Sequence, residues 1–233
     1  VQGPPGSGKT HVGATVLRAL VERGWRIGVV AQSHDVVEHL LRKAIDLGVP
    51  ADRVGKRPRS GSTIVPGVAL QPRDIAGFLA GEGGRILGGT SWTFANAEQV
   101  PRHALDLLVV DEAGQYSLAD TIACSVSAAR LLLLGDPQQL PQVSQGHHPE
   151  PIDESALGWL ADGHDVLPAG LGVFLAQSWR MHPVLCDAVS ALSYKGALHA
   201  APVAARRVLA GPAPGVHVVD VVHEGNAVES REE

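Results

Sequence analysis

The chain has 233 residues, of which 45% are hydrophobic and 18% are charged, and its formal net charge at pH 7 is −5. This composition predicts a globular protein with one large domain, or one domain and part of another. No stretch approaches the roughly 20 consecutive apolar residues of a membrane-spanning helix and no signal peptide is visible, so we expect a cytoplasmic protein without a membrane partner. The mild charge argues against general affinity for nucleic acids but is compatible with a local basic track.

The first motif is an octet near the beginning of the chain that fits the pattern G-x-x-x-x-G-K-[ST]. It consists of Gly3, Pro4, Pro5, Gly6, Ser7, Gly8, Lys9 and Thr10. In such a loop the backbone N–H groups surround phosphate oxygens, the lysine adds positive charge, and the threonine hydroxyl can bind Mg²⁺. We therefore predict that the octet binds ATP and that Thr10 is a ligand of Mg²⁺.

Downstream of the octet, helical and strand-like patterns alternate. Apolar residues at helical spacing predict a helix over residues 11–23, and Gly24 follows where a helix commonly ends. A buried strand is predicted over residues 27–31 and a second helix over residues 35–47. Ser33 precedes this second helix, so it is predicted to be an N-cap, a ligand contact, or both.

Residues 49–84 are interrupted by many Gly and Pro residues, and we interpret them as an irregular or weakly structured insertion. The segment contains four basic residues that are equally compatible with solvated loop charges and with phosphate contacts. These residues are Arg53, Lys56, Arg57 and Arg59.

Three more strands are predicted in the next part of the chain. Residues 85–90 form a short strand that ends in a turn, and residues 107–110 and 131–134 are apolar runs typical of central strands. Alternation of strands and helices predicts an α/β fold in which helices cover a parallel sheet. Polar clusters follow these strands, and parallel strands end along one edge of a sheet, so the clusters should converge there.

Two adjacent acidic residues, Asp111 and Glu112, directly follow the run at 107–110. Hydrolysis of ATP requires a carboxylate near the metal and a group that activates the attacking water. We assign Asp111 to Mg²⁺ binding and Glu112 to water activation. The next polar cluster, residues 135–141, contains amide side chains that would lie near the γ-phosphate.

Taken together, the motifs resemble those of the superfamily 1 helicases, in the branch that includes the nonsense-mediated-decay helicase and the Okazaki-fragment nuclease-helicase. Asp-Glu-Ala-Gly at 111–114, Gly-Asp-Pro-Gln-Gln-Leu at 135–140 and Gln-Ser-Trp-Arg-Met-His-Pro at 177–183 follow the phosphate loop in the order of that family. The last segment is similar to the branch's Gln-Tyr-Arg-Met-His-Pro. The segment Ser-Tyr-Lys-Gly-Ala-Leu at 193–198 resembles the one that usually follows it. The resemblance implies a P-loop NTPase of the RecA-like type.

The resemblance also implies roles for two further residues of the nucleotide site. In the family, the glutamine that matches Gln139 couples the γ-phosphate to nucleic-acid contacts. The arginine that matches Arg180 stabilises the charge that develops on the transferring phosphoryl group. The predicted catalytic set is therefore Lys9, Glu112, Gln139 and Arg180.

Two shorter segments, residues 31–34 and 89–91, resemble motifs that line the strand-binding surface in the family. This resemblance predicts nucleic-acid contacts for Ser33, His34 and Thr90, because hydroxyl groups and helix N-termini bind phosphate without reading bases. Trp92 and Phe94 could offer a face for base stacking, although aromatic residues in such a position are more often part of the core.

The family uses two RecA-like lobes with ATP between them. We expect residues 1–209 to form the first lobe, truncated at its N-terminus, residues 210–215 a linker, and residues 216–233 the beginning of the second lobe. Residues 215–222 are predicted to be its first strand, and residues 229–233 resemble the start of its first helix. On this interpretation the chain is a fragment of a larger helicase, and an upstream fused nuclease domain is a further hypothesis.

The sequence thus predicts an ATP-dependent helicase or translocase on single-stranded nucleic acid, with DNA and RNA both open. One alternative is a P-loop ATPase that remodels protein–nucleic-acid complexes without separating strands. Another is a degenerate lobe that serves as a nucleotide-binding or docking module. The intact chemical groups of the predicted catalytic set argue against degeneracy.

Overall fold

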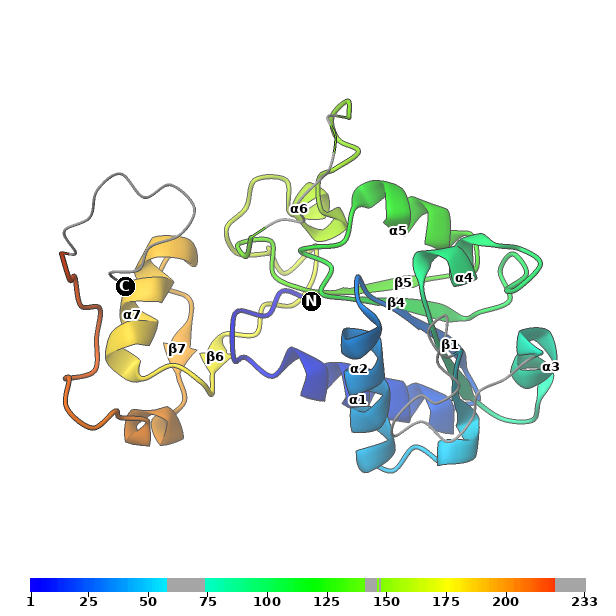
Figure 1. Ribbon diagram of the computed structural model, residues 1–233, viewed down its shortest axis with the longest axis horizontal. Coiled ribbons are helices and arrows are strands. Elements are labelled where there is room, and N and C mark those ends of the chain that lie inside the picture. The colour runs from blue at the N-terminus through cyan, green and yellow to red at the C-terminus, as the bar shows by residue number, and fades with distance from the viewer. Residues whose placement is uncertain (58–73, 141–145, 147, 221–233) are drawn as a thin grey trace.

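The computed structural model describes residues 1–57, 74–140, 146 and 148–220, and its centre is a five-stranded parallel sheet (Figure 1). The strand order is β2-β3-β1-β4-β5, and every neighbouring pair is parallel. In that order the strands span Val54–Lys56, Arg85–Gly89, Arg26–Val30, Leu107–Asp111 and Leu131–Leu134. The predicted α/β fold with a RecA-like parallel sheet is therefore confirmed.

Helices cover both faces of the sheet, and Figure 1 shows them in two layers. One face packs against α1 (Lys9–Glu22) and α2 (His34–Asp46), whose buried residues include Leu17 and Leu40. The other face packs against α3 (Ile75–Ala80), α4 (Ser91–Ala95), α5 (Leu118–Ser125) and α6 (Ala156–Ala161). The central strand β4 is buried along its whole length, which explains its continuous apolar run.

The first half of the fold follows the sequence prediction closely. The two predicted helices are α1 and α2, and Gly24 follows the first of them with a φ of 85°. The side chain of Ser33 accepts a hydrogen bond from Val36 N at 3.3 Å, so Ser33 is the N-cap of α2. The N-cap interpretation of Ser33 is confirmed.

The interpretation of residues 49–84 as an irregular insertion is wrong for part of that segment. After a single turn of 3₁₀ helix, η1 (Ala51–Arg53), residues 54–56 form β2, and residues 75–80 form α3. The strand has only three residues, with a glycine in the middle, so it has no recognisable period in the sequence. Pairing with β3, which places Lys56 opposite Gly88, defines it. Arg59 lies outside the described residues.

The expectation that 131–134 is a central strand also needs correction. β5 is the last strand of the sheet, and Leu131 at its start is 42% exposed. Among the described residues, Gln2 adds a neighbour on the open side of β5, where it makes an isolated parallel bridge with Gly135 just after the strand. Gln2 makes a second parallel bridge with Phe174, so the residue before the phosphate loop continues the sheet.

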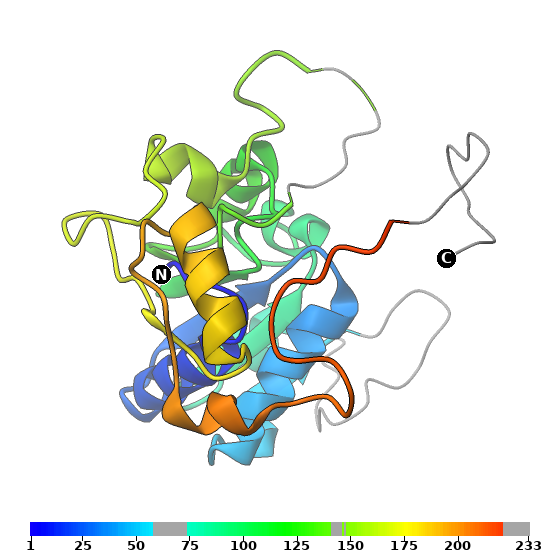
Figure 2. The ribbon, with the colours of Figure 1, turned by 90° about the vertical axis from the view of Figure 1, so that its left-hand side faces the viewer.

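The C-terminal part of the described chain forms a small unit beside the sheet. It contains β6 (Gln177–Ser178), α7 (Pro183–Ser193), β7 (His199–Ala200) and the 3₁₀ helix η2 (Pro202–Arg206). Strands β6 and β7 pair in parallel, and α7 lies in front of the main sheet in the view of Figure 2.

The predicted first strand of a second lobe is not present in its described part, residues 215–220. Val216, Val218 and Val219 there are between 72% and 87% exposed, and they pair with no strand in the part of the chain that the structure describes. Residues 221–222 of that strand and the predicted helix at 229–233 lie outside the described residues, so a second lobe stays a prediction. Within the part of the chain that the structure describes, no helix is long and apolar enough to cross a membrane.

Candidate nucleotide site and nucleic-acid surface

The phosphate loop leaves the sheet after Gln2 and runs directly into α1. Gly6 and Gly8 have φ angles of 74° and 87°, which suit glycine, and Gly8 is the N-cap of α1. Gly3 N donates to the Gly135 carbonyl at 2.8 Å, so the loop is attached to the turn after β5. The ammonium group of Lys9 donates to the Gly3 carbonyl at 2.7 Å, across the loop. The loop therefore has the geometry that phosphate binding at a helix N-terminus requires.

Ser7 provides an independent indication that this loop fits an anionic ligand. Its residue is 7% exposed, and its Oγ is buried without a hydrogen-bond partner within the described parts of the chain. A buried hydroxyl without a partner is costly, and a phosphate oxygen could accept its hydrogen. The unpaired hydroxyl of Ser7 therefore supports phosphate binding by this loop, independently of the match to the motif.

The loop opens into a cavity of about 370 Å³. The octet supplies Pro4, Gly6, Ser7, Gly8, Lys9 and Thr10 to its lining, and the other lining residues are Glu112, Trp179, Arg180 and Arg207. Three of the four predicted catalytic residues, Lys9, Glu112 and Arg180, therefore face one cavity although they are far apart in the sequence.

Asp111 is the last residue of β4 and is 4% exposed. Burial raises the pKa of its carboxyl group from 3.8 to about 6, the negative charge of Glu112 adds to this effect, and the backbone N–H of Glu112 and the charge of Lys9 oppose it. The Glu112 N–H donates to Asp111 Oδ1 at 3.0 Å. A buried carboxylate with a raised pKa is typical of a site that receives a cation, and Mg²⁺ prefers such an oxygen ligand.

Glu112 has a φ of 53°, a left-handed conformation that is rare for a residue with a side chain. Such backbone strain costs of order 1–3 kcal/mol and is concentrated at functional sites. Here the conformation turns the chain sharply after β4, and the Glu112 side chain lines the cavity while Asp111 stays buried beneath it.

The turns after β4 and β5 are in direct contact. Ala113 N donates to the Leu134 carbonyl at 2.8 Å, and a Cβ atom at Gly114 would collide with the carbonyl of Asp136. Only glycine permits this close approach at residue 114. The two motifs that the sequence analysis expected to converge at the sheet edge do so through these backbone contacts.

Gln139, the fourth predicted catalytic residue, does not line the cavity, and its side chain is bonded to Asp136 instead. Asp136 Oδ2 accepts hydrogen bonds from Gln139 Nε2 at 3.2 Å and from the Tyr194 hydroxyl at 2.7 Å. Asp136 and Tyr194 are 1% and 2% exposed, and burial raises the pKa of the Tyr194 hydroxyl. The predicted γ-phosphate residue is thus connected through one buried carboxylate to the end of α7.

Arg180 reaches the cavity because its segment packs against the phosphate loop. Trp179 N donates to the Gly6 carbonyl at 2.8 Å, and the Ser178 hydroxyl donates to the Pro5 carbonyl at 3.0 Å. A Cβ atom at Gly6 would collide with the Cβ of Arg180. The position of the arginine and the shape of the loop are therefore set by the same contacts.

The structure adds two residues to the nucleotide site that the sequence analysis did not assign to it. Trp179, 51% exposed, and Arg207, at the end of η2, both line the cavity. The sequence could have indicated Trp179, because it directly precedes Arg180 and stands where the related motif has its aromatic residue. No sequence signal marks Arg207, because only the packing of the C-terminal unit brings it to the loop.

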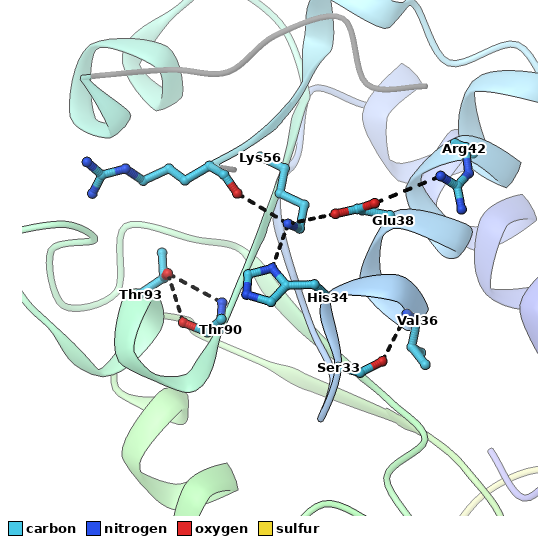
Figure 3. Close-up of polar contacts among 9 residues, drawn as sticks. Ser33, His34, Val36, Glu38, Arg42, Lys56, Thr90 and Thr93 are labelled. Atoms are coloured by element: carbon cyan, nitrogen blue, oxygen red, sulfur yellow. Dashed lines mark hydrogen bonds and ion pairs between the residues drawn. The ribbon is translucent and has the colours of Figure 1, made fainter. Parts of the chain in front are cut away.

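The three predicted nucleic-acid residues lie together at the carboxyl edge of the sheet. Ser33 and His34 follow β1, Thr90 follows β3, and these strands pair with Val30 opposite Gly89 (Figure 3). Ser33 is exposed, and the side chain of Thr90 forms a capping box with Thr93 at the start of α4. The structure therefore brings the three residues to one surface, while their contact with nucleic acid remains a prediction.

The two aromatic residues after Thr90 have opposite environments. Phe94 is fully buried, so the core interpretation is confirmed for it, whereas Trp92 is 84% exposed and is not part of the core. The helix α4 has five residues and places the two side chains on different sides. Trp92 thus remains available as a stacking face near Thr90.

Lys56 contradicts both interpretations of the basic residues at 49–84. It is 0% exposed, so it is neither a solvated charge nor able to contact a phosphate directly. Its ammonium group instead lies 3.1 Å from Glu38 Oε1 and 2.8 Å from His34 Nδ1. No local sequence pattern indicates this burial, because it follows from the pairing of the short strand β2 with β3.

A parallel sheet with a phosphate loop, an acidic pair after one strand and an arginine facing the same cavity defines a P-loop nucleotide-binding protein of the RecA-like class. The comparison with family models is more specific. Residues 1–157 match the AAA domain family, and the chain belongs to this family.

Curated relatives of the chain include proteins that are named as helicases. It is 31% identical over 208 residues to Replicase polyprotein 1ab of Bat coronavirus HKU9, covering 86% of this chain and 3% of that polyprotein. It is 27% identical over 241 residues to Regulator of nonsense transcripts 1 of Caenorhabditis elegans, covering 85% of this chain and 22% of that protein. The human DNA replication ATP-dependent helicase/nuclease DNA2 is 23% identical over 206 residues, which cover 85% of this chain and 19% of that protein. The predicted superfamily 1 relationship is confirmed, and the chain spans less than a quarter of each relative.

Solved structures agree on the fold. Arterivirus nonstructural protein 10 (helicase), in complex with DNA, matches with a TM-score of 0.54 and 19% identity, covering 87% of this chain and 41% of that chain. A second crystal structure of Arterivirus nonstructural protein 10 (helicase) matches with a TM-score of 0.55 and 21% identity, covering 86% of this chain and 40% of that chain.

The burial of Asp111 leads to a prediction about stability. Because the folded protein has the higher pKa, about 6 against 3.8, the carboxyl group lowers stability as pH rises through this interval, and the loss is complete above it. Replacement of Asp111 by Asn removes the buried charge and should stabilise the Mg²⁺-free and nucleotide-free protein at pH 7.5, by at most about 3 kcal/mol. Urea unfolding at pH 7.5 and pH 4 measures the difference.

The stabilising effect of Asp111→Asn should be much smaller at pH 4, where the wild-type carboxyl group is largely protonated in the folded protein. Glu112→Gln should stabilise the protein less at pH 7.5, because it removes only the neighbouring charge, which raises the pKa of Asp111 less than burial does. An equal effect of Asp111→Asn at both pH values would show that burial of the charge is not the cause.

Proposed function

We propose that the full-length protein is an ATP-dependent helicase or translocase that acts on single-stranded DNA or RNA. The observation that carries this proposal is the shared cavity of Lys9, Glu112 and Arg180, beside a sheet edge that also presents Ser33, His34 and Thr90. One edge thus offers groups for hydrolysis and groups for a polynucleotide backbone. The helicase names of several relatives support the same assignment.

The nucleotide would bind with its phosphates in the octet, where Lys9 and the N–H groups at the start of α1 face the anion. Thr10 and Asp111 would hold Mg²⁺ together with phosphate oxygens and water, which suits its preference for oxygen ligands. When bound, Mg²⁺ would neutralise charge on the phosphates during transfer. The chain's own Glu112 would accept a proton from the attacking water, and Arg180 would stabilise the charge that develops.

Gln139 would report the state of the γ-phosphate to the rest of the protein. Its amide nitrogen is held by Asp136, which also accepts the hydrogen bond of Tyr194. A change at the nucleotide would therefore be transmitted to α7 through one carboxylate. This connection supports a motor in which hydrolysis and movement are coupled.

The strand-binding surface would use neutral groups and an aromatic face. Hydroxyl groups and a helix N-terminus bind phosphates of any sequence, as translocation requires. Trp92 adds an exposed ring on which a base can stack. Residues 1–209 would form the first lobe of the motor and the segment after a linker at 210–215 would begin the second, in a cytoplasmic protein with a fused nuclease domain as a further hypothesis.

The proposal is tested by ATP hydrolysis in the full-length protein, with and without single-stranded DNA or RNA. We expect strong stimulation by at least one polymer, and Glu112→Gln should lower kcat by roughly 100-fold or more while nucleotide binding is retained, because an amide cannot accept the water's proton. Lys9→Ala should instead weaken nucleotide binding by roughly 10-fold or more, since it removes a charge-assisted hydrogen bond.

Hydrolysis that no nucleic acid stimulates would reject the motor and favour a different ATPase. Equal loss of nucleotide affinity in both variants would show that the roles of Lys9 and Glu112 are assigned wrongly. Strand-separation assays on a duplex with a single-stranded tail distinguish a helicase from a translocase that only remodels protein–nucleic-acid complexes.

Arg180 should act on the transition state more than on the bound nucleotide. Arg180→Ala is expected to lower kcat by about 100- to 1,000-fold and to change KM for ATP only slightly, because charge on the phosphoryl oxygens rises during transfer. Arg180→Lys should recover little of this loss, since it keeps the charge but not the planar fork of donors. A large rise in KM with unchanged kcat would assign Arg180 to ground-state binding.

Trp92→Ala should weaken binding of single-stranded oligonucleotides by roughly 5- to 150-fold, the range that loss of one base–aromatic stack produces. Fluorescence anisotropy with a labelled oligonucleotide measures the affinity. Trp159→Ala is the matched control, because Trp159 is also exposed, at 53%, but lies on α6 away from Thr90. Equal effects of the two substitutions would remove Trp92 from the strand-binding surface.

A further inference from the structure

A lysine, a glutamate and a histidine form a buried cluster beside the proposed strand-binding surface (Figure 3). Lys56 ends β2 and is 0% exposed, Glu38 lies on α2 and is 7% exposed, and His34 is the first residue of α2. The stem of Lys56 passes Gly88, where its Cδ lies 3.4 Å from the position that a Cβ atom would occupy, which is an ordinary contact, whereas two side chains of α2 would lie only 2.6 Å and 2.8 Å from that atom. The glycine therefore allows α2 to pack closely on β3 beside the lysine.

Burial of the charged groups in this cluster costs folding free energy. A buried ammonium group loses its hydration, and one carboxylate partner only partly compensates for this loss. A pair of apolar residues would fill the same space at a lower cost in free energy. The presence of a buried lysine at this position is therefore not explained by stability alone.

The hydrogen bonds of Lys56 determine where the proton of His34 lies. An ammonium group has three N–H donors and no acceptor. Within the described ranges, Lys56 Nζ lies 3.1 Å from Glu38 Oε1, 2.8 Å from His34 Nδ1 and 3.2 Å from the Arg57 carbonyl oxygen. Because Lys56 can only donate, His34 Nδ1 must accept, and the neutral ring carries its hydrogen on Nε2.

We propose that Lys56, held by Glu38, is a positioning residue of the strand-binding surface: it fixes His34 in the tautomer that donates from Nε2 to the backbone of a bound single strand. This inference rests on the proposed function. His34 follows β1 at the same edge where Thr90 follows β3. A neutral N–H donor in a fixed orientation contacts phosphate oxygens without requiring a particular base.

The arrangement also explains why Lys56 does not contact the strand itself. Its position at the end of the edge strand β2 would allow an exposed lysine to bind phosphate directly, but it is buried and points toward α2 (Figure 3). The positive charge is instead used within the protein, and Glu38 balances it. Arg42, 3.9 Å from Glu38 Oε2, lies at the solvent side of the same carboxylate.

The experiment compares the full-length wild-type protein with the double variant Lys56→Met/Glu38→Gln. Methionine retains the unbranched stem, and removal of both charges avoids the buried unpaired carboxylate that Lys56→Met alone would leave. Nitrogen NMR of ¹⁵N-histidine-labelled protein reports the tautomer of His34, whose signals are identified by their loss in His34→Gln. We expect the Nε2–H tautomer in the wild-type protein and a mixture of tautomers in the double variant.

Binding of a labelled single-stranded oligonucleotide, measured by fluorescence anisotropy, gives the second readout. The double variant should bind about 3- to 10-fold more weakly, the range of one hydrogen bond, with unchanged ATP hydrolysis in the absence of nucleic acid. In a His34→Ala background, the same two substitutions should cause no further loss, because Lys56 acts through His34.

Three results would overturn this inference. One is an Nδ1–H or doubly protonated His34 in the wild-type protein, and another is a loss of affinity that remains in the His34→Ala background. The third is wild-type affinity in the double variant while the wild-type protein binds the oligonucleotide normally, which leaves the proposed function intact. Failure of the wild-type protein to bind any single strand would overturn both proposals.

Discussion

The hydrogen bonds of Gln2 hold together the segments on which the nucleotide site depends. Its backbone pairs with Val173 and Leu175, and the next residue, Gly3, is bonded to Gly135. Its fully buried side chain donates to the Asp165 carbonyl and accepts from Leu167 N, both at 2.8 Å. The phosphate loop, the turn after β5 and the segment leading to Arg180 are therefore fixed relative to one another before any ligand contact is considered.

The nucleotide site could be predicted because most of its functional residues lie in short contiguous sequence motifs. The octet, the Asp111–Glu112 pair and Arg180 each follow a recognisable pattern, and the parallel sheet brings them to one edge. The residues that were missed depend on packing between distant segments. Trp179 and Arg207 reach the cavity only because the C-terminal unit packs on the phosphate loop, and no local pattern encodes that contact.

The burial of Lys56, one of the basic residues at 49–84, could not be predicted from the local sequence. A charge in a Gly/Pro-rich segment is usually solvated, and Lys56 would be so if β2 did not pair with β3. Three residues with a central glycine carry too little periodicity to predict a strand, and burial of the lysine follows from the strand. Similarly, α4 has the composition of a core segment, but five residues of helix are enough to bury Phe94 and expose Trp92.

The contact between Gly6 and Arg180 has a consequence for how the sequence can change. Phosphate loops are commonly thought to retain glycine because the nucleotide needs the space, but here a Cβ atom at residue 6 would first meet the arginine's own Cβ. A side chain at Gly6 would be excluded even in a homologue that had lost ATP binding, as long as the Arg180 segment kept its place. Because the collision involves the Cβ and backbone atoms at position 180, replacement of the arginine by any other residue with a side chain would leave it in place.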